Sequence, residues 1–489
     1  MSYFIPKEVQ DIVSGLQEAG FKAYPVGGCV RDLVIGREPK DWDITTSAKP
    51  DEIREIFPES VYNNEFGTVG VKTGSDDGSL RVVEVTTFRK EGKYTDKRHP
   101  DEVCFADRVE DDLSRRDFTI SALALDTESG ELIDIYGGQS DIRKKLIRTV
   151  GDASKRFEED ALRLMRAVRF VTELGISDGW RIEEGTYNAI RSQAQLLSVI
   201  ARERVRDELV GILMSRDAAE GMRLLEEVNL LQYIIPELRE GIGVDQAKHH
   251  TFTVWEHSIR SLEYAAKHRY SLAVRMAALL HDVGKPRTKQ GEGEEATFYN
   301  HEIVGARMAR EILERLAFPG QFVKDVAHLV RYHLFYYNVG EVTESGVRRF
   351  LSRVGVEYID DLIKVREADR IGSGVPKAFP YKLRHLLYMI EKVRRDPLSS
   401  KMLAIGGDEV METAGMESGP RVGWILSALL DEVLDDPEKN NKEYLTKRVK
   451  KLAELSDEEL QRKAEAGKWK IQEFERGVEE EMKSRYHVK

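Results

Sequence analysis

The sequence lacks the features of secreted, membrane-bound and disordered proteins. Its 489 residues include only two cysteines, Cys29 and Cys104, which cannot build a disulfide framework, so we expect a reduced cytoplasm. No apolar run approaches the roughly 18 residues of a membrane-spanning helix, and the first apolar segment is interrupted by Lys7, Glu8 and Asp11. With 14 prolines and 41% hydrophobic residues, the composition is typical of a folded protein. We therefore expect no signal peptide and no membrane partner.

A positive net charge is also missing. The 75 Lys and Arg residues are outnumbered by 86 Asp and Glu residues, which gives a net charge of −11. An acidic total does not favour a nucleic-acid partner, yet it does not exclude one, because short basic stretches can follow an RNA backbone. Three such stretches are present, and each is also typical of a solvated surface: residues 143–148, 392–395 and 447–451.

The apolar patterns predict an α+β domain followed by a long helical region. Within the first 150 residues they predict a helix over 5–19 and strands over 21–26, 41–46, 68–73, 80–89 and 132–136. From residue 153 to about 395 nearly every segment has the helical period, and a further helix is expected at 422–434. The predicted fold class is therefore α+β, with a mixed sheet in the first domain only.

A double glycine between a strand and a helix is the first candidate site. Gly27 and Gly28 follow the strand predicted at 21–26 and precede a helix that begins near Cys29. Glycine lets a backbone approach a ligand closely, and the amide groups of a helix start favour phosphate. A plain strand–turn–helix junction gives the same pattern, so the glycines alone do not define a site.

Three carboxylates strengthen the case for this site. Asp41 and Asp43 alternate with apolar residues on a predicted strand, so both should project from one face. Glu84 lies within another apolar strand, where we expect it to be buried, and burial without a partner would be unfavourable. Like charges held together repel unless a cation lies between them, which predicts Mg²⁺ on Asp41 and Asp43 with Glu84 as a third acid. This set suits two-metal nucleotidyl transfer, although an isolated aspartate pair also fits a solvated strand end.

Further motifs follow these residues in a fixed order. They are GGCVRD (27–32) with DWD (41–43), EVTTFR (84–89), DLSRRDFT (112–119), DIYGG (134–138) and EDALR (159–163). In this order they resemble the class II tRNA nucleotidyltransferases, the CCA-adding enzymes and bacterial poly(A) polymerases of the polymerase-beta superfamily. Ser121 departs from the family, which usually has Asn there, and this leaves local sugar or phosphate contacts open. The resemblance implies a polymerase-beta-like nucleotidyltransferase head. The residues expected to hold the sugar and triphosphate are Gly27, Gly28, Arg31, Arg115, Arg116 and Asp117.

Asp160 and Arg163 are the residues expected to select the base. They are three positions apart in a helix predicted over 157–170, and so would share a face. An aspartate accepts from the exocyclic amine of cytosine or adenine while an arginine donates to the adjacent ring acceptor, a pattern that uracil and guanine do not match. The resemblance implies this role, and Arg166 and Arg169 would extend a basic edge toward the phosphates. A surface ion pair of small value is the alternative.

Residues 89–105 form a basic, turn-rich segment beside this proposed site. In the resembled family a flexible loop at this place helps the pocket change from C to A, and enzymes that add only CC have it shortened. Its full length here favours CCA addition or A addition over CC addition. A solvated connection is the alternative.

Histidines gather in one region. Eight of the eleven lie between residues 249 and 333, and the doublet His281-Asp282 resembles the signature of HD-domain phosphohydrolases. Mixed nitrogen and oxygen ligands suit Mn, Ni, Co or Fe better than a structural zinc. The expected chemistry is attack of metal-activated water on a phosphate ester, with Lys285 near a phosphate oxygen. The alternative is an inactive, structural HD domain. The resemblance implies the ligands His257, His281, Asp282 and Asp369, with His301 and His333 available to a second metal.

The resulting prediction is an enzyme that adds C, C and A to the 3′ end of tRNA from CTP and ATP, with a second, phosphohydrolase activity in the HD region. The closest alternatives are an A-adding enzyme and a poly(A) polymerase; a more distant one is an HD phosphohydrolase with an RNA-binding head. Some CCA-adding enzymes use the HD domain against 2′,3′-cyclic phosphates or 2′-nucleotides. Four parts are expected: head (1–150), neck (151–235), HD region (236–395) and a tRNA-binding tail (396–489).

Overall fold

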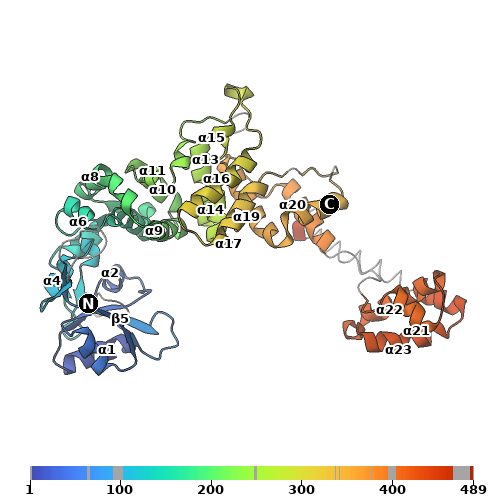
Figure 1. Ribbon diagram of the computed structural model, residues 1–489, viewed down its shortest axis with the longest axis horizontal. Helices are drawn as coiled ribbons and strands as arrows, with labels where there is room; N and C mark the ends of the chain where they lie inside the picture. The colour runs from blue at the N-terminus through green and yellow to red at the C-terminus, as the bar shows by residue number, and fades with distance from the viewer. Residues whose placement is uncertain are drawn as a thin grey trace. The chain divides into compact units, whose positions relative to one another are not determined.

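The computed structural model of the chain (Figure 1) describes residues 3–62, 67–91, 103–246, 251–335, 337–340, 342–375, 377–394, 403–465 and 485–487. The chain divides into two compact units. The first contains Met1–Leu334 and Asp361–Pro376, and the second contains Phe335–Asp360 and Lys377–Lys489. Head, neck and most of the HD region therefore belong to one unit.

The head is built on a five-stranded mixed sheet with the strand order β1-β2-β5-β4-β3. Its strands are β1 (Ala23–Pro25), β2 (Asp43–Thr46), β3 (Ser60–Tyr62), β4 (Thr68–Lys72) and β5 (Val82–Thr87). β2 and β5 are parallel, whereas the other pairs are antiparallel. The strands predicted at 21–26, 41–46, 68–73 and 80–89 are confirmed in shorter form, and the strand predicted at 132–136 is reduced to β9 (Leu132–Ile133).

Short hairpins and helices complete the head. β6 (Arg89–Glu91) pairs with β7 (Val103–Phe105), and β8 (Ala124–Leu125) pairs with β9 (Leu132–Ile133). The predicted first helix is confirmed as α1, which buries one stripe of apolar side chains made of Val9, Ile12, Val13 and Leu16. The head helices are α1 (Lys7–Glu18), α2 (Gly28–Ile35), α3 (Pro50–Ile56), α4 (Val109–Ser114) and α5 (Gly138–Lys144).

The neck is helical, as predicted, with two differences. One is β11 (Arg181–Ile182), which pairs in parallel with β10 (Leu146–Ile147). The other is a break in the helix predicted over 157–170, because α6 ends at Glu159 and α7 begins at Arg163. The neck helices are α6 (Ala153–Glu159), α7 (Arg163–Leu174), α8 (Glu184–Gln193), α9 (Arg202–Met214), α10 (Ala218–Glu227) and α11 (Leu231–Ile234), and α12 (Pro236–Arg239) begins the HD region.

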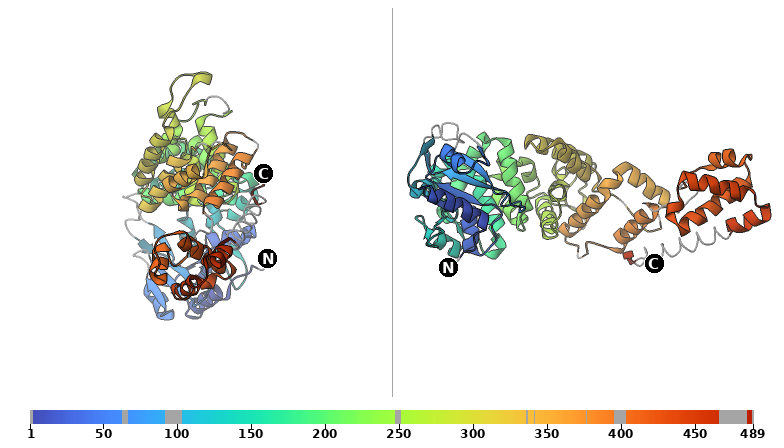
Figure 2. Two further views of the ribbon diagram at one scale, coloured as in Figure 1. Left: turned by 90° about the vertical axis from the view of Figure 1, so that its right-hand side faces the viewer. Right: turned by 90° about the horizontal axis from the view of Figure 1, so that it is seen from below.

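The rest of the first unit consists of helices almost alone (Figure 2). These are α13 (Val254–Lys267), α14 (Leu272–Leu280), α15 (Lys285–Thr288), α16 (His301–Arg315), α17 (Gly320–Tyr332) and α19 (Ile359–Gly372). Arg275 on α14 is buried and donates to the carbonyls of Leu213 and Ser215 at 2.7 and 2.8 Å, at the end of α9. This arginine links the HD region to the neck within the unit.

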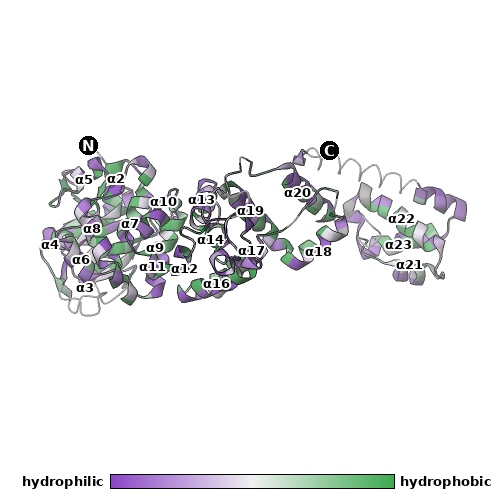
Figure 3. Cartoon of the chain, turned by 90° about the horizontal axis from the view of Figure 1, so that it is seen from above, coloured by the Kyte–Doolittle hydropathy of each residue, from purple (hydrophilic) through white to green (hydrophobic). Residues whose placement is uncertain are grey.

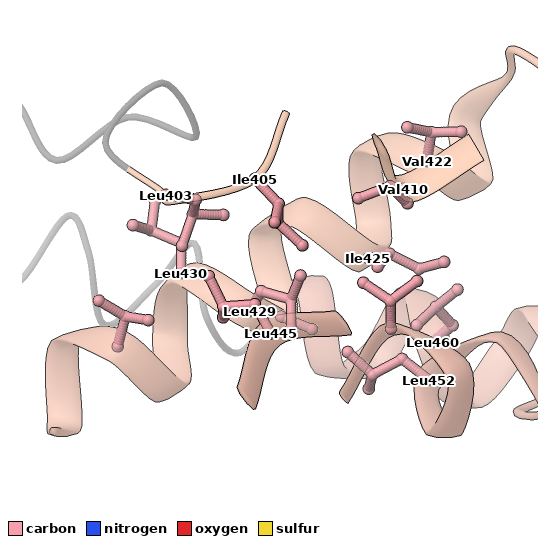
Figure 4. Packing of buried hydrophobic residues seen from close by; sticks show 13 residues of the cluster. Leu403, Ile405, Val410, Val422, Ile425, Leu429, Leu430, Leu445, Leu452 and Leu460 are labelled. Carbon is pink, nitrogen blue, oxygen red and sulfur yellow. The ribbon is translucent and has the colours of Figure 1, made fainter. Parts of the chain in front are cut away.

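The second unit holds α18 (Glu344–Val354), α20 (Tyr381–Arg394), α21 (Gly407–Ala414), α22 (Pro420–Asp435) and α23 (Lys442–Ala453). The helix predicted at 422–434 is confirmed within α22. Residues such as Ile425, Leu429 and Leu445 form an apolar core between α21, α22 and α23 (Figure 4).

Hydrophobic and hydrophilic residues are interspersed along the helices of the chain (Figure 3). Among the residues that the structure describes, no helix has both the length and the apolar character needed to cross a bilayer.

Candidate active sites

The glycine turn of the head lies against Asp43. Gly27 has a φ of +85°, a conformation that disfavours any residue with a side chain. A Cβ there would lie 2.6 Å from Nη1 of Arg116 and 3.8 Å from Oδ2 of Asp43. The Gly27 amide donates to the Leu123 carbonyl at 3.0 Å, and α2 begins at Gly28. Bare backbone is therefore placed between an arginine and an acid.

The two cysteines are free thiols in different surroundings. Cys29 lies at the start of α2, where its Sγ donates to the Val26 carbonyl at 3.3 Å. Burial raises the pKa of Cys29 to about 12. Cys104 lies exposed on β7. Only Cys104 therefore presents its sulfur to solvent.

Two of the three predicted carboxylates, Asp43 and Glu84, meet on neighbouring inner strands of the sheet. Asp43 on β2 and Glu84 on β5 are direct partners in the parallel register, so they project from the same face. Asp41 lies exposed just before β2, and Trp42 between the two aspartates is buried, so the strand predicted over both aspartates carries only Asp43. Burial raises the pKa of Asp43 to about 6; Arg116 opposes this rise, and the charges of Asp41 and Glu84 add to it.

Glu84 differs from expectation in one respect. It is exposed, whereas the sequence predicted a buried acid within an apolar strand. β5 buries every second residue, Val83, Val85 and Thr87, and leaves the intervening face open. The predicted penalty of an unpartnered buried acid is therefore wrong, and the case for Glu84 depends on its register with Asp43.

Arg115 and Arg116 share a carboxylate that the sequence reasoning did not assign. Asp112 on α4 is fully buried and accepts from Arg115 Nε at 2.9 Å and Arg116 Nη2 at 3.4 Å. Although burial alone would raise the pKa of Asp112, the two guanidinium groups hold it below its ordinary value. Its spacing of three and four residues from the arginines was a usable signal.

Asp117, predicted at the nucleotide sugar, is held from the neck. Arg166 Nε on α7 donates to Asp117 Oδ2 at 2.7 Å, and the Phe118 amide donates to Oδ1 at 2.9 Å. Burial alone would raise the pKa of Asp117, but Arg166 and Arg163 lower it overall. This contact joins the head motif at 112–119 to the predicted base-selecting motif at 159–163.

Asp160 and Arg163 do not share a helical face, which corrects the sequence prediction. Asp160 follows α6 in an extended conformation, and its Oδ1 accepts from the Leu162 amide at 3.0 Å. Arg163 begins α7 and donates to Glu159 Oε2 at 2.6 Å. The two side chains thus leave the chain on either side of a helix break. Their role in base selection stays a prediction.

Two residues of α9 that the sequence reasoning missed contact this segment. Arg204 Nη2 donates to Asp160 Oδ2 at 2.8 Å. Buried Glu208 lies 3.1 Å from Arg169 Nε and 3.7 Å from Arg166 Nη1. Arg166 and Arg169 are therefore paired with acids and do not form the open basic edge that was expected. A pair of charges four residues apart on α9 was the available signal, but its partners lie far away in the sequence.

Other predicted contacts are only partly described. Of the loop predicted at 89–105, residues 92–102 lie outside the described residues, and β6 and β7 flank them. Ser121 is buried on a 3₁₀ turn. Each basic stretch has charges paired within the protein: Arg148 with Asp141, Lys392 with Glu344 at 3.2 Å, and Lys447 with Glu443 at 2.7 Å. Residue 395 lies outside the described residues.

In the HD region, the four predicted metal ligands converge from α13, from the end of α14 and from α19. Nε2 of His257 lies 2.8 Å from Nε2 of His281. Asp282 Oδ2 lies 3.1 and 3.2 Å from these two nitrogens, and Asp369 Oδ1 lies 3.3 and 3.7 Å from them. All four residues are buried. Two imidazoles and two carboxylates facing one point form a donor set that fits a divalent transition metal.

A second histidine pair faces the other oxygen of Asp282. Nε2 of His301 and of His333 lie 3.5 and 3.8 Å from Asp282 Oδ1. His281, His301 and His333 each place Nδ1 within 2.8 Å of a backbone carbonyl. These contacts keep the proton on Nδ1 and leave Nε2 to bind a metal. His257, His281, Asp282 and Asp369 would thus hold one metal ion, and Asp282, His301 and His333 would supply ligands to a second.

This cluster lies at the base of a cavity of about 620 Å³. Lys285 is buried there, with Nζ 2.7 Å from Asp282 Oδ2 and 2.6 Å from Gln246 Oε1. Burial alone would raise the pKa of Asp282, but His281 and Lys285 hold it well below its usual range. The other side chains at the wall include Phe298, Tyr299, Arg366 and Arg370. Cations and aromatic rings beside a metal-type donor set suit a phosphate ester of nucleotide size.

These arrangements define a class of protein. A nucleotidyltransferase head joined to an HD domain has this set of features: acids on adjacent parallel strands beside a glycine turn, then a helical neck and an HD cluster. Family models match in the same order. The model of the poly A polymerase head domain matches residues 23–148, that of the probable RNA and SrmB-binding site of polymerase A matches 179–242, and that of the HD domain matches 254–372.

Similarity to characterised proteins narrows this class. The CCA-adding enzyme of Lactococcus lactis is 32% identical over 450 residues, which covers 92% of this chain and 97% of that protein. The A-adding tRNA nucleotidyltransferase of Deinococcus radiodurans is 38% identical over 421 residues, covering 83% and 90%. The Bacillus stearothermophilus CCA-adding enzyme solved in complex with CTP aligns with a TM-score of 0.60 and 30% identity, covering 91% and 97%. The chain belongs to the class II tRNA nucleotidyltransferases, the family of the CCA-adding enzymes, and membership implies the use of divalent metal ions.

Proposed function

We propose that this enzyme adds C, C and A to the 3′ end of tRNA from CTP and ATP and releases pyrophosphate. The observation that carries this function is the register of Asp43 with Glu84 beside the backbone of Gly27. With this register, the two acids lie on one face of the head, beside glycine backbone that a phosphate could approach closely. The CTP complex of the similar Bacillus enzyme supports CTP as a substrate. Because tRNA is its substrate, the enzyme works in the cytoplasm.

Asp41 and Asp43 are the residues proposed to hold Mg²⁺, with Glu84 as the third acid. When bound, the metal ions lower the pKa of the RNA 3′-hydroxyl and neutralise the triphosphate. The negative charges of Asp41 and Glu84 act on Asp43, and a divalent cation would relieve the repulsion among these acids. Arg116 lies between Asp112 and the Gly27 turn, where its guanidinium can meet a phosphate. Asp41→Ala should abolish addition; full activity of that variant would contradict this assignment.

Asp160 and Arg163 are proposed to recognise the Watson–Crick edge of the incoming base. Arg204 fixes the carboxylate of Asp160, and Glu159 fixes the guanidinium of Arg163. Held in this way, an acceptor and a donor sit in a fixed order, which matches cytosine and adenine and excludes uracil and guanine. Residues 159–163 therefore replace a nucleic-acid template.

A-adding activity is the second candidate, because the Deinococcus relative carries that name. One assay separates the two. Purified enzyme with Mg²⁺ receives tRNAs that end before CCA, after C and after CC, with CTP or ATP supplied singly. CCA addition predicts CTP incorporation on the first two tRNAs and ATP incorporation on the third. Incorporation of ATP alone, on CC-ended tRNA only, would establish the A-adding enzyme.

The HD region is proposed to be a metal-dependent phosphohydrolase, with His257, His281, Asp282 and Asp369 as ligands of Mn, Ni, Co or Fe. When bound, the metal activates water for attack on a phosphate ester. Lys285 lies beside Asp282, where it can pair a phosphate oxygen. A second ion would use His301 and His333. Elemental analysis of metal-saturated enzyme should find one or two ions in this region.

The two active sites are proposed to work independently. His281→Ala should lose bound transition metal and hydrolysis of a 2′,3′-cyclic phosphate, while CTP addition stays at the wild-type rate. Loss of both activities in a folded variant would show that the sites are coupled.

We also propose that the chain has four parts, divided at residues 150, 235 and 395, and that the basic stretches and the tail contact tRNA.

A further inference from the structure

One aromatic ring of the neck lies under three guanidinium groups. The Cζ atoms of Arg31, Arg166 and Arg169 lie 5.4, 5.0 and 5.0 Å from the ring centroid of Phe170. Phe170 is itself buried on α7 and meets Phe118 of the head edge to face, with the centroids 5.6 Å apart. The ring therefore has contacts with the head on two sides.

Two of the arginines are expected neighbours, but the third is not. Arg166 and Arg169 precede Phe170 on the same helix, α7. Arg31 comes from α2 of the head, directly after the glycine turn, and is thus brought to the ring by tertiary structure. Each guanidinium also has its own acid: Asp32 for Arg31, Asp117 for Arg166 and Glu208 for Arg169. These acids balance the charge, but the shared contact of the three cations is the negative face of one ring.

The neck is shaped to keep this arrangement. Gly211 on α9 faces Arg169, and a Cβ at that position would lie 2.4 Å from Arg169 Cδ. Only glycine leaves room for the arginine stem between α7 and α9. The glycine of α9 therefore helps to confine Arg169, one of the three arginines at the ring.

We propose that Phe170 is a positioning residue for nucleotide binding, which holds Arg31 of the phosphate-binding turn in register with the base-selecting segment of the neck. The ring touches no substrate. It fixes the distance between the head residues that meet the triphosphate and the α7 residues behind the base. This inference rests on the proposed role of Arg31 at the phosphates.

The test compares Phe170→Leu with Phe170→Tyr in the full-length enzyme. Leucine keeps an apolar side chain but removes the ring face, whereas tyrosine keeps the ring. For Phe170→Leu we expect the KM for CTP and for ATP to rise roughly tenfold, equivalent to about 1.4 kcal/mol of binding, with kcat within about twofold of wild type. Phe170→Tyr should restore the wild-type KM. Phe157→Leu on α6 is the matched control, since the described residues place no guanidinium over that buried ring.

The outcomes separate the possible failures. An unchanged KM in folded Phe170→Leu, or an equal rise in Phe157→Leu, would overturn the positioning role. If Arg31→Met leaves the KM unchanged, the proposed phosphate contact of Arg31 is wrong; if Arg31→Met raises it and Phe170→Leu does not, only the role of Phe170 fails. Should the leucine variant not fold, Phe170→Met takes its place and should raise the KM in the same way.

Discussion

At the scale of single residues, Gly27 has little freedom to change. Its positive φ and the short distance from a Cβ to Arg116 both oppose a side chain. We expect Gly27→Ala to lower kcat/KM for CTP roughly 100-fold, because displacement of the turn misplaces the nucleotide. The matched control is Gly36→Ala at the end of α2. Gly36 has a φ of +80° with open space around it, so it should cost only about 1 kcal/mol of stability and leave kcat/KM unchanged.

Asp112 gives a second prediction for a single residue. Its carboxylate is buried between Arg115 and Arg116, so Asp112→Asn leaves two guanidiniums without their counter-charge. We expect a loss of about 3 kcal/mol in the free energy of unfolding, measured by urea denaturation. Asp111→Asn is the control, because its partner Lys90 lies 3.1 Å away at the surface, and the loss should stay below about 1 kcal/mol. Equal losses in the two variants would contradict the buried pairing.

At the scale of elements, α9 supports the break between α6 and α7. We expect Arg204→Gln to lower the discrimination of CTP over UTP about tenfold, because Asp160 loses the donor that fixes its orientation. Steady-state incorporation of each nucleotide measures this ratio. Arg202→Gln at the start of α9, whose arginine donates to the Tyr233 carbonyl, is the control and should keep the ratio of the wild type. Retained discrimination in Arg204→Gln would remove α9 from the account of specificity.

Elements also show where sequence reasoning succeeded. The apolar pattern at 80–89 predicted the strand that carries Glu84, because a strand has a fixed period of two, whereas Asp41 lies before β2, the strand predicted to carry it. The His281-Asp282 doublet predicted a cluster that the structure assembles from several helices. The helix over 157–170 was predicted as continuous because its apolar residues keep the helical period. The break at Asp160 depends on hydrogen bonds from Leu162 and Arg204, and the second of these comes from 44 residues away, which no local pattern reveals.

For the whole molecule, the charge of −11 limits how tRNA binds. One cation in each basic stretch is already paired with an acid, which reduces the number available to RNA phosphates. We expect tRNA affinity to fall with salt along a shallow line on a double-logarithmic plot, with a slope equivalent to a few released ions. Fluorescence anisotropy between roughly 50 and 200 mM KCl measures it. A slope near zero would show that phosphate contacts contribute nothing.

The contrast between the two thiols has a practical consequence for the whole molecule. A maleimide dye at neutral pH requires an accessible thiolate, which buried Cys29, with its raised pKa, does not supply. Cys104 is exposed on β7, next to the segment whose family counterpart adapts the pocket from C to A. The natural chain therefore accepts one fluorophore at a chosen place without any mutation. Such a labelled enzyme would test, in real time, whether the ribbon of β6 and β7 responds to CTP, ATP or tRNA.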